Sequence, residues 1–421
     1  MNRHRKEPRA AAAGLSRREV LKAGAALELL ALLPGGLART WRAARATEPG
    51  QRVLVIVQLT GGNDGLNTVV PFLDDRYHRA RPVLALRPER VVRLNDHLGL
   101  HPALGALLPF WDEGALSVVQ GIGYPDENRS HFRSMEIWHT ARTDEAPPTA
   151  GWLGLAAGLH AEHASADGLS GLPFVRVGGR DLPLALAGAP RQVPALAALK
   201  DLVLETPVAE GRGSAARTLL QELCRAPFDR TGEAAFVAAA DGAAFDCTQR
   251  LHDLARTSPR GGPGTPLAGA LALAAQLIGA QLGTRVVYVT HEGFDTHARQ
   301  ERAHEGCLRA LGDALADFQA RLARQGDEHR VTTFVFSEFG RRIEENGSGG
   351  TDHGAGAPAL LLGRPVKGGL LGPDPDLSGE RDTDVPVGVD FRSVYASVLD
   401  WLGMPAAQVV PGSPPRLPLF A

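Results

Sequence analysis

Cysteine is scarce in this 421-residue chain, which contains only Cys224, Cys247 and Cys307. Three cysteines allow at most one intramolecular disulfide, so the folded state must be stabilised by a hydrophobic core and not by cross-links. Their spacing matches no cysteine-rich zinc motif, and we interpret all three as small buried residues.

An excess of charge is lacking as well. The chain has 45 basic and 47 acidic residues and a formal net charge of −2. Nothing in this balance indicates a nucleic acid or an anionic membrane as a partner. The 49 glycines and 30 prolines lie below the share that signals disorder, so we expect a folded protein rich in loops.

Beyond the first 46 residues, no run approaches the about 20 apolar residues of a membrane span, so we expect no transmembrane span. Residues 1–46 predict a twin-arginine signal peptide. The pair Arg17-Arg18 precedes a mostly apolar run at 23–33 and a small-residue cleavage pattern that ends at Ala46. The predicted partner is the Tat export machinery, and the predicted location is periplasmic or secreted. Glu28 within the apolar run favours the alternative, an ordinary basic amphipathic N-terminus.

The apolar pattern predicts an α/β protein. Short runs rich in β-branched residues predict buried strands at 52–59, 115–122, 285–290, 331–336 and 359–362. Apolar residues spaced three and four apart predict helices, the main ones at 265–283, 308–322 and 390–402. Residues 151–264 carry little chemistry, and we interpret them as connecting structure with a helical insertion at about 185–264.

Side chains that bind metals or anions follow four of the predicted strands. They are Asp64, then Ser130 with His131, then Asp295 with His297, then Glu338 followed by Asp352 and His353. In open α/β sheets ligands bind at the carboxyl ends of the strands, so we expect these loops to meet in one pocket. Mixed carboxylate and imidazole donors suit Zn, Mn or Ca. Any single loop of this kind is also explained by the polar residues that crowd most loops.

Two of these residues have a simpler alternative role. Asp64 lies in a glycine-rich turn at 60–68, which lacks the features of a phosphate-binding or dinucleotide-binding loop. It is either a metal ligand or a residue that merely holds the turn. Ser130 precedes a predicted helix, where free backbone N–H groups suit a nucleophile or an anion, or where it is only the helix cap.

Five segments together resemble a known family. They are Leu-Thr-Gly-Gly-Asn-Asp64-Gly-Leu-Asn, Asn-Arg-Ser130-His-Phe, Gly-Phe-Asp295-Thr-His297, Ser-Glu338-Phe-Gly-Arg and Gly-Thr-Asp352-His353-Gly. This set resembles the exported bacterial domain-of-unknown-function family 1501, which is grouped with alkaline phosphatases, sulfatases and phosphoglycerate mutases. The resemblance implies that residues 47–421 form an alkaline phosphatase-like domain, a three-layer sandwich with a mostly parallel central sheet.

The resemblance also implies roles for single residues. Asp64 would be the first metal-binding carboxylate, and Ser130 the nucleophile at a helix N-terminus. Asp295, His297 and His353 would hold one metal. The sequence has Glu338-Phe339 where the superfamily usually has Asp-His, and one residue instead of three between Asp295 and His297. A site with two metals, one metal or none therefore stays open.

We predict an exported, metal-dependent hydrolase of phosphate or sulfate esters, acting on a small molecule or a glycan. Ser130 would attack, and Arg129, Arg133 or Arg341 would steady the anionic group. The candidate metal ligands are Asp64, Asp295, His297, Glu338, Asp352 and His353. The alternative is a catalytically inactive relative that binds an envelope glycan or a partner protein in the same cleft, and a third possibility is a purely structural envelope protein.

Overall fold

The computed structural model describes residues 52–163, 172–190, 193–197, 264–379 and 383–420. The predicted signal peptide at 1–46 and most of the predicted insertion at 185–264 lie outside the described residues. Within these ranges, no helix combines the length and the apolar character needed to cross a bilayer.

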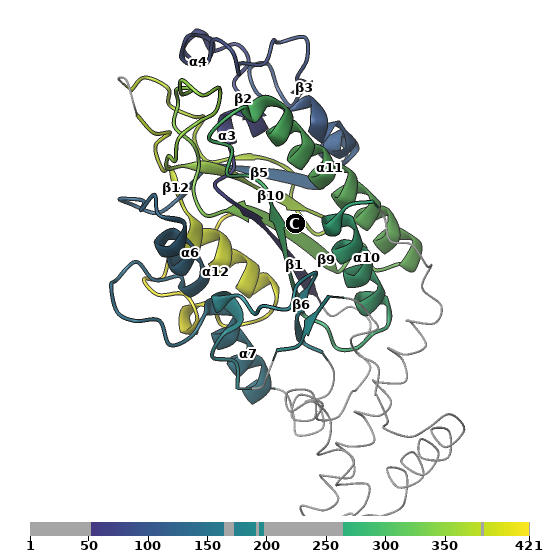
Figure 1. Cartoon of the computed structure of the whole chain (residues 1–421). Coiled ribbons are helices and arrows are strands. Elements are labelled where there is room, and N and C mark those ends of the chain that lie inside the picture. Colours follow the sequence, from purple (N-terminus) through teal and green to yellow (C-terminus); the bar gives the residue numbers. More distant parts are fainter. Residues whose placement is uncertain (1–51, 164–171, 191–192, 198–263, 380–382, 421) are drawn as a thin grey trace, which may run out of the picture.

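A nine-stranded sheet forms the centre of the molecule (Figure 1). Its order is β11 (Gly369–Leu371), β5 (Leu116–Gly123), β10 (Ala357–Leu362), β9 (Val331–Ser337), β1 (Val53–Thr60), β8 (Val286–Glu292), β6 (Phe174–Val177) and β7 (Ala195–Leu196), and β12 (Val389–Asp390) pairs with β5. β10 is antiparallel to β5 and β9, whereas the other strand pairs of this sheet in the described chain are parallel. The prediction of a mostly parallel sheet is confirmed.

Helices cover both faces of this sheet, because its strands are apolar on both sides. Val55 and Val57 of β1 pack on the same side as α10 (Pro266–Gly279) and α11 (Gln300–Gln325). Leu54 and Ile56 pack on the side of α6 (His131–Thr140), α7 (Trp152–His163) and α12 (Phe391–Trp401). Figure 1 shows the two helical layers with the sheet between them. The predicted three-layer α/β sandwich is confirmed.

Smaller elements complete the described chain. They are α3 (Gly65–Thr68), α4 (Asp75–Ala80), η1 (Pro102–Leu107), α5 (Leu108–Asp112), η2 (Leu184–Leu186), η4 (Ala406–Gln408) and a three-stranded antiparallel sheet of β2 (Val69–Val70), β4 (Gly99–Leu100) and β3 (Val92–Arg93). The small sheet and the helices near it follow the glycine-rich turn after β1.

The interpretation of 151–264 as connecting structure and insertion is wrong at its beginning. α7 contributes Trp152 and Leu153 to the core, and β6 extends the central sheet by parallel pairing with β8. β7 lies within the range predicted for the insertion but pairs with β6. Strands this short carry too few residues to show a period, and only their long-range pairing identifies them.

The strand directions bring four loops to one edge. β1, β5, β8 and β9 all run the same way, so their carboxyl ends share that edge. β10 runs the opposite way, so the whole loop that joins β9 to β10, including His353, lies at this edge. The loops pack closely: Gly61 has φ +121°, and a Cβ on it would lie 2.3 Å from the backbone nitrogen of Asp295. Only glycine fits this conformation and this approach.

Candidate metal centre

Three imidazoles converge on the carboxylate of Asp295. The Nε2 atoms of His297 and His353 lie 3.0 and 3.2 Å from its Oδ1 atom. The Nε2 atom of His131 lies 3.7 Å from its Oδ2 atom. The Asp295 side chain is 51% exposed, so the cluster is open to solvent and to a ligand. The site therefore combines the loops after β5 and β8 with the segment before β10.

The second ring nitrogen of each of these imidazoles faces an oxygen atom. The contacts join Nδ1 of His131 to Oε1 of Glu338 at 2.9 Å, Nδ1 of His353 to the backbone oxygen of Arg129 at 2.8 Å, and Nδ1 of His297 to Oδ1 of Asp352 at 3.3 Å. A carboxylate or carbonyl oxygen accepts a hydrogen bond and therefore places the proton on Nδ1. The Nε2 lone pair of each ring is then directed to the Asp295 side, as metal ligation requires.

The donor set fits a single divalent metal. One ligand atom each from His131, Asp295 and His353 lie within 4.8 Å of one another. The Nε2 atoms of His297 and His353 are 2.9 Å apart, a separation at which two lone pairs repel unless a cation or a proton lies between them. Imidazole nitrogens with one carboxylate oxygen are ligands of zinc and related ions.

Arg341 holds Asp295 in the ionised form. Its side chain is fully buried and donates to Oδ1 of Asp295 at 2.7 Å. Burial would raise the pKa of Asp295, but its contacts with Arg341, His353 and His297 outweigh burial and lower the pKa. The remaining donors of Arg341 bind the backbone oxygens of Gly61, Gly62, Phe294 and Thr351. Arg341 therefore ties the strand-end loops together, and its Nη1 atom also lies 3.4 Å from Nε2 of His297.

The pKa values of two imidazoles move in opposite directions. The hydrogen bond to Glu338 raises the pKa of His131, whereas burial is the main cause that lowers the pKa of His353. A neutral ring is the form that binds a metal, so His353 is ready for ligation at neutral pH.

Glu338, predicted from the sequence as a ligand, lies behind His131. Its side chain is 1% exposed, and its Oε1 atom also accepts from the backbone N–H of Gly61 at 2.8 Å. Its Oε2 atom accepts from the hydroxyl of Ser337 at 3.0 Å. These contacts make Glu338 a residue that orients His131. Asp352 likewise contacts the ring of His297 and accepts from Asn346 at 3.0 Å.

The structure does not bring Asp64 into this cluster. Its carboxylate is completely buried, and its two oxygens lie 2.9 and 2.7 Å from the same guanidinium nitrogen of Arg81. Gln300 also donates to it. Burial opposes ionisation, but the charge and hydrogen bonds of Arg81 and the hydrogen bond from Gln300 outweigh it and lower the pKa of Asp64. These contacts favour the role of a residue that holds the turn over that of a metal ligand.

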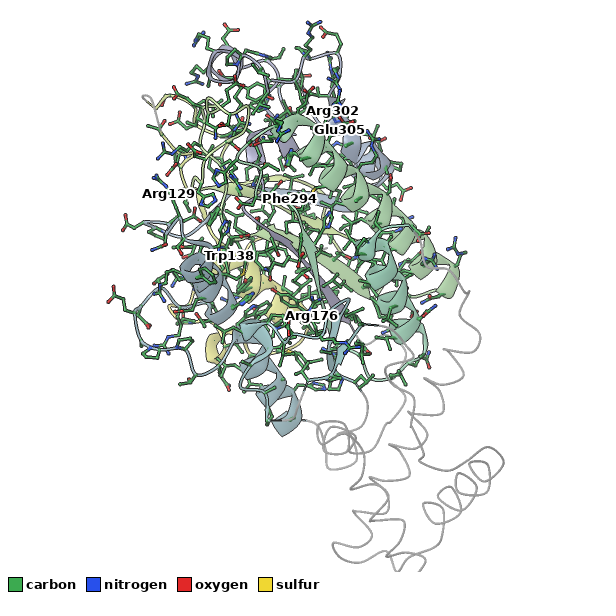
Figure 2. The ribbon with its side chains drawn as sticks, viewed as in Figure 1. Arg129, Trp138, Arg176, Phe294, Arg302 and Glu305 are labelled. Atoms are coloured by element: carbon green, nitrogen blue, oxygen red, sulfur yellow. The ribbon has the colours of Figure 1, made fainter. Side chains whose placement is uncertain are left out.

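Ser130 occupies the N-cap position of α6, directly before His131. The residue is exposed, and its hydroxyl makes no capping hydrogen bond. α6 is anchored by Trp138, labelled in Figure 2, whose ring stacks on Phe336 of β9 at 4.8 Å between centroids. The core thereby positions the helix start, while the Ser130 hydroxyl stays accessible.

The other two predicted anion-binding arginines have acidic partners. Arg129, labelled in Figure 2, forms an ion pair with Asp384. Arg133 forms an ion pair with Glu136 and donates to the backbone oxygen of Asp144. Neither arginine contacts Asp295.

His131 is the residue whose role the sequence left unassigned. The sequence places it beside Ser130, after a predicted strand and at the edge where the other donors lie. An imidazole in the first helical turn after that strand is the signal that could have identified it.

A family model described as "Protein of unknown function (DUF1501)" matches residues 51–413. None of the curated proteins compared with the chain matches it. The family predicted from the five sequence segments is confirmed.

Several solved structures are similar to the chain at low identity. A protein in the alkaline phosphatase superfamily from Vibrio parahaemolyticus is 9% identical, with 91% of this chain and 74% of that chain covered and a TM-score of 0.39. The PsFucS1 sulfatase from Pseudoalteromonas sp. is 9% identical, with 93% and 72% covered and a TM-score of 0.36. The lipoteichoic acid synthase LtaP from Listeria monocytogenes is 7% identical, with 91% and 78% covered and a TM-score of 0.39.

Proposed function

The chain belongs to the family described as "Protein of unknown function (DUF1501)", and because that description names no activity, we propose from the site itself that the protein is an exported, metal-dependent hydrolase of phosphate or sulfate esters. The observation that carries the proposal is the convergence of three Nε2 atoms on the Asp295 carboxylate. The proposal that the protein is exported rests on the sequence of residues 1–46 alone.

Asp295, His353, His131 and His297 would hold the metal, with Zn, Mn or Ca as candidates. When bound, such an ion polarises an ester oxygen and stabilises developing negative charge. Arg341 keeps Asp295 ionised, and Glu338 keeps the lone pair of His131 directed at the site. These two buried residues reduce the reorganisation that ligand binding would otherwise require.

Ser130 is the proposed nucleophile. Its exposed hydroxyl is adjacent in sequence to His131, and it begins a helix of ten residues whose first N–H groups have no side-chain cap. These N–H groups and the helix dipole favour a negative charge at this position, whether on the serine oxygen or on the ester. The serine oxygen would form a bond to phosphorus or sulfur while the bond from that atom to the substrate's alcohol oxygen breaks, and the alcohol would leave with the proton of the serine hydroxyl. Water would then hydrolyse the seryl ester, release phosphate or sulfate and restore the hydroxyl.

The experiment combines metal analysis of the purified protein with a screen of chromogenic phosphate and sulfate esters. We expect a bound divalent metal and a turnover that a chelator removes. Ser130→Ala should abolish turnover without loss of bound metal, and Ser378→Ala, an exposed serine elsewhere, should leave it unchanged. Protein that binds no metal and hydrolyses no ester would overturn the proposal.

A second candidate function follows from the arginines. Arg129, Arg133 and Arg341 each have an acidic partner, which competes with an anionic ester for their donors. This favours the catalytically inactive relative, which would use the same metal centre to bind an envelope glycan through its hydroxyl groups. Metal-dependent binding of a glycan without turnover would support that alternative.

A further inference from the structure

A second pocket opens beside the first turns of α11 and shares no residue with the candidate metal centre. Its volume is about 340 Å³. The polar residues in its wall are Asn67, Arg87, Arg90, His101, Gln300, Glu301 and His304. Figure 2 labels Arg302 and Glu305 on the same turns of α11 and locates this end of the helix. The pocket thus lies against α3, the short helix within the glycine-rich turn, and against the segment that precedes β3.

Two histidines with buried side chains line the wall, and each uses only one of its two ring nitrogens in a hydrogen bond within the described chain. His101 and His304 are 5% and 2% exposed, and their rings meet edge to face. Nδ1 of His101 accepts from the backbone N–H of Ala103, so its Nε2 carries a proton. Nε2 of His304 donates to the side-chain oxygen of Asn63, so its Nδ1 keeps a lone pair. In the described chain, neither that Nε2 nor that Nδ1 has a hydrogen-bond partner.

These two rings remain neutral at physiological pH. Burial lowers the pKa of both His101 and His304 to about 4. The wall therefore offers one donor and one acceptor, and a hydroxyl group can accept from one ring and donate to the other.

Positive charge lies at the rim of the pocket. Arg87 and Arg90 are exposed, and within the described residues neither forms an ion pair. Arg90 is near enough to His101 to lower its pKa. The single carboxylate in the lining is that of Glu301, so the two guanidinium groups leave an excess of positive charge. Guanidinium groups bind carboxylates and phosphates through paired hydrogen bonds.

The inner wall is held rigidly in place. Gln300 donates to the buried carboxylate of Asp64, and its side-chain oxygen accepts from the hydroxyls of Thr296 and Thr351 at 3.1 and 2.6 Å. Asn67 donates to the backbone oxygen of Leu84 at 2.8 Å. A wall whose amides are already bonded does not need to rearrange when a ligand binds, which lowers the free-energy cost of binding.

We propose that this pocket binds a small hydroxylated anion, whose carboxylate or phosphate contacts Arg87 and Arg90 and whose hydroxyl contacts His101 and His304. The site is independent of the proposed hydrolase activity, because the metal centre contributes nothing to its wall.

The test is a calorimetric titration of the full chain, stripped of metal with a chelator, with sn-glycerol 3-phosphate and with L-malate. Saturable binding of either probe is expected, and the preferred probe separates a phosphate from a carboxylate ligand. Arg90→Gln and Arg87→Gln should each weaken binding by about tenfold, since each removes one charged donor pair. The matched control Arg302→Gln, an exposed arginine of α11 outside the lining, should bind like the wild type.

Two further variants keep the test decisive. Ala85→Trp places a large ring in the lining and should abolish binding while thermal unfolding still shows a folded protein. His353→Ala removes a candidate metal ligand and should leave probe binding intact. The proposal is overturned if neither probe binds at about 10 mM, if binding survives in Arg90→Gln and Ala85→Trp unchanged, or if it is lost in His353→Ala.

Discussion

The Nδ1 atom of His131 lies 2.9 Å from the Oε1 atom of Glu338, and the same oxygen accepts from the backbone N–H of Gly61. One buried carboxylate therefore joins the loops that follow β5, β9 and β1. It directs the free nitrogen of His131 to Asp295 and so prepares that ring as a ligand.

The first prediction concerns this carboxylate. Glu338→Gln should weaken metal binding by about 10- to 100-fold, because an amide holds the Nδ1 proton of His131 less strongly than a carboxylate does. Competition with a chromophoric zinc chelator measures the affinity. Glu328→Gln, a change at a partly exposed carboxylate beside His329, is the control. Equal zinc affinity in Glu338→Gln and wild type would contradict an orienting role.

The second prediction separates a structural from a metal-binding role for Asp64. Asp64→Asn leaves the Arg81 guanidinium buried without its counter-charge, which should cost about 3–5 kcal/mol in the free energy of unfolding. Denaturant unfolding measures this loss. Asp400→Asn breaks an exposed pair with Arg416 and should cost less than about 1 kcal/mol. An Asp64→Asn protein of normal stability that has lost its metal would support the ligand role instead.

The third prediction concerns acid sensitivity. His139 is buried with its Nε2 atom 3.1 Å from oxygens of both Gln58 and Tyr288, and burial lowers its pKa to about 4. The pKa of His139 in the folded state lies below the ordinary value of about 6.5. Its contribution to the free energy of unfolding is therefore complete above about pH 6.5. It is lost as the pH falls toward 4, by up to about 1.4 kcal/mol per pH unit.

The free energy of unfolding measured across this pH range checks that expectation. His139→Gln should lose less stability on acidification than the wild type, and His329→Gln, which changes an exposed imidazole, should follow the wild-type curve. Parallel curves for His139→Gln and wild type would show that His139 does not cause the loss.

The fourth prediction concerns Glu127, whose contribution to stability is lost as the pH rises and not as it falls. Burial, with a smaller contribution from Asp384, raises the pKa of Glu127 well above its ordinary value. The folded pKa of this acid lies above the unfolded one, so its contribution is present below about pH 4.5 and is lost as the pH rises toward the folded pKa. Glu127→Gln keeps the shape and removes the charge, so it should unfold at higher temperature than the wild type at neutral pH.

Thermal unfolding at two pH values measures this gain, which should disappear in acid. Glu113→Gln, at an exposed carboxylate paired with Arg364, provides the comparison. A Glu127→Gln protein less stable than the wild type at neutral pH would mean that the ionised carboxylate has a favourable partner.

Much of the fold could be predicted from the sequence because the signal is local. The apolar runs at β1, β5, β8, β9 and β10 and the three- and four-residue spacing of α11 are visible within a short window, and the residue types that follow each strand indicate ligand chemistry. β6 and β7 could not be predicted from the sequence, because strands of two to four residues show no periodic pattern and are defined by pairing with strands far along the chain.

The sequence by itself determined the α/β class, the family and the edge of the sheet at which donor side chains gather. Only the tertiary structure decided which of those donors face one another. Glu338 and His131 are 207 positions apart, and the guanidinium of Arg341 could be seen to bind four carbonyl oxygens only once the loops were placed. The physical reason is that a hydrogen bond depends on the distance and direction between two atoms, and residue type and spacing along the chain do not specify either.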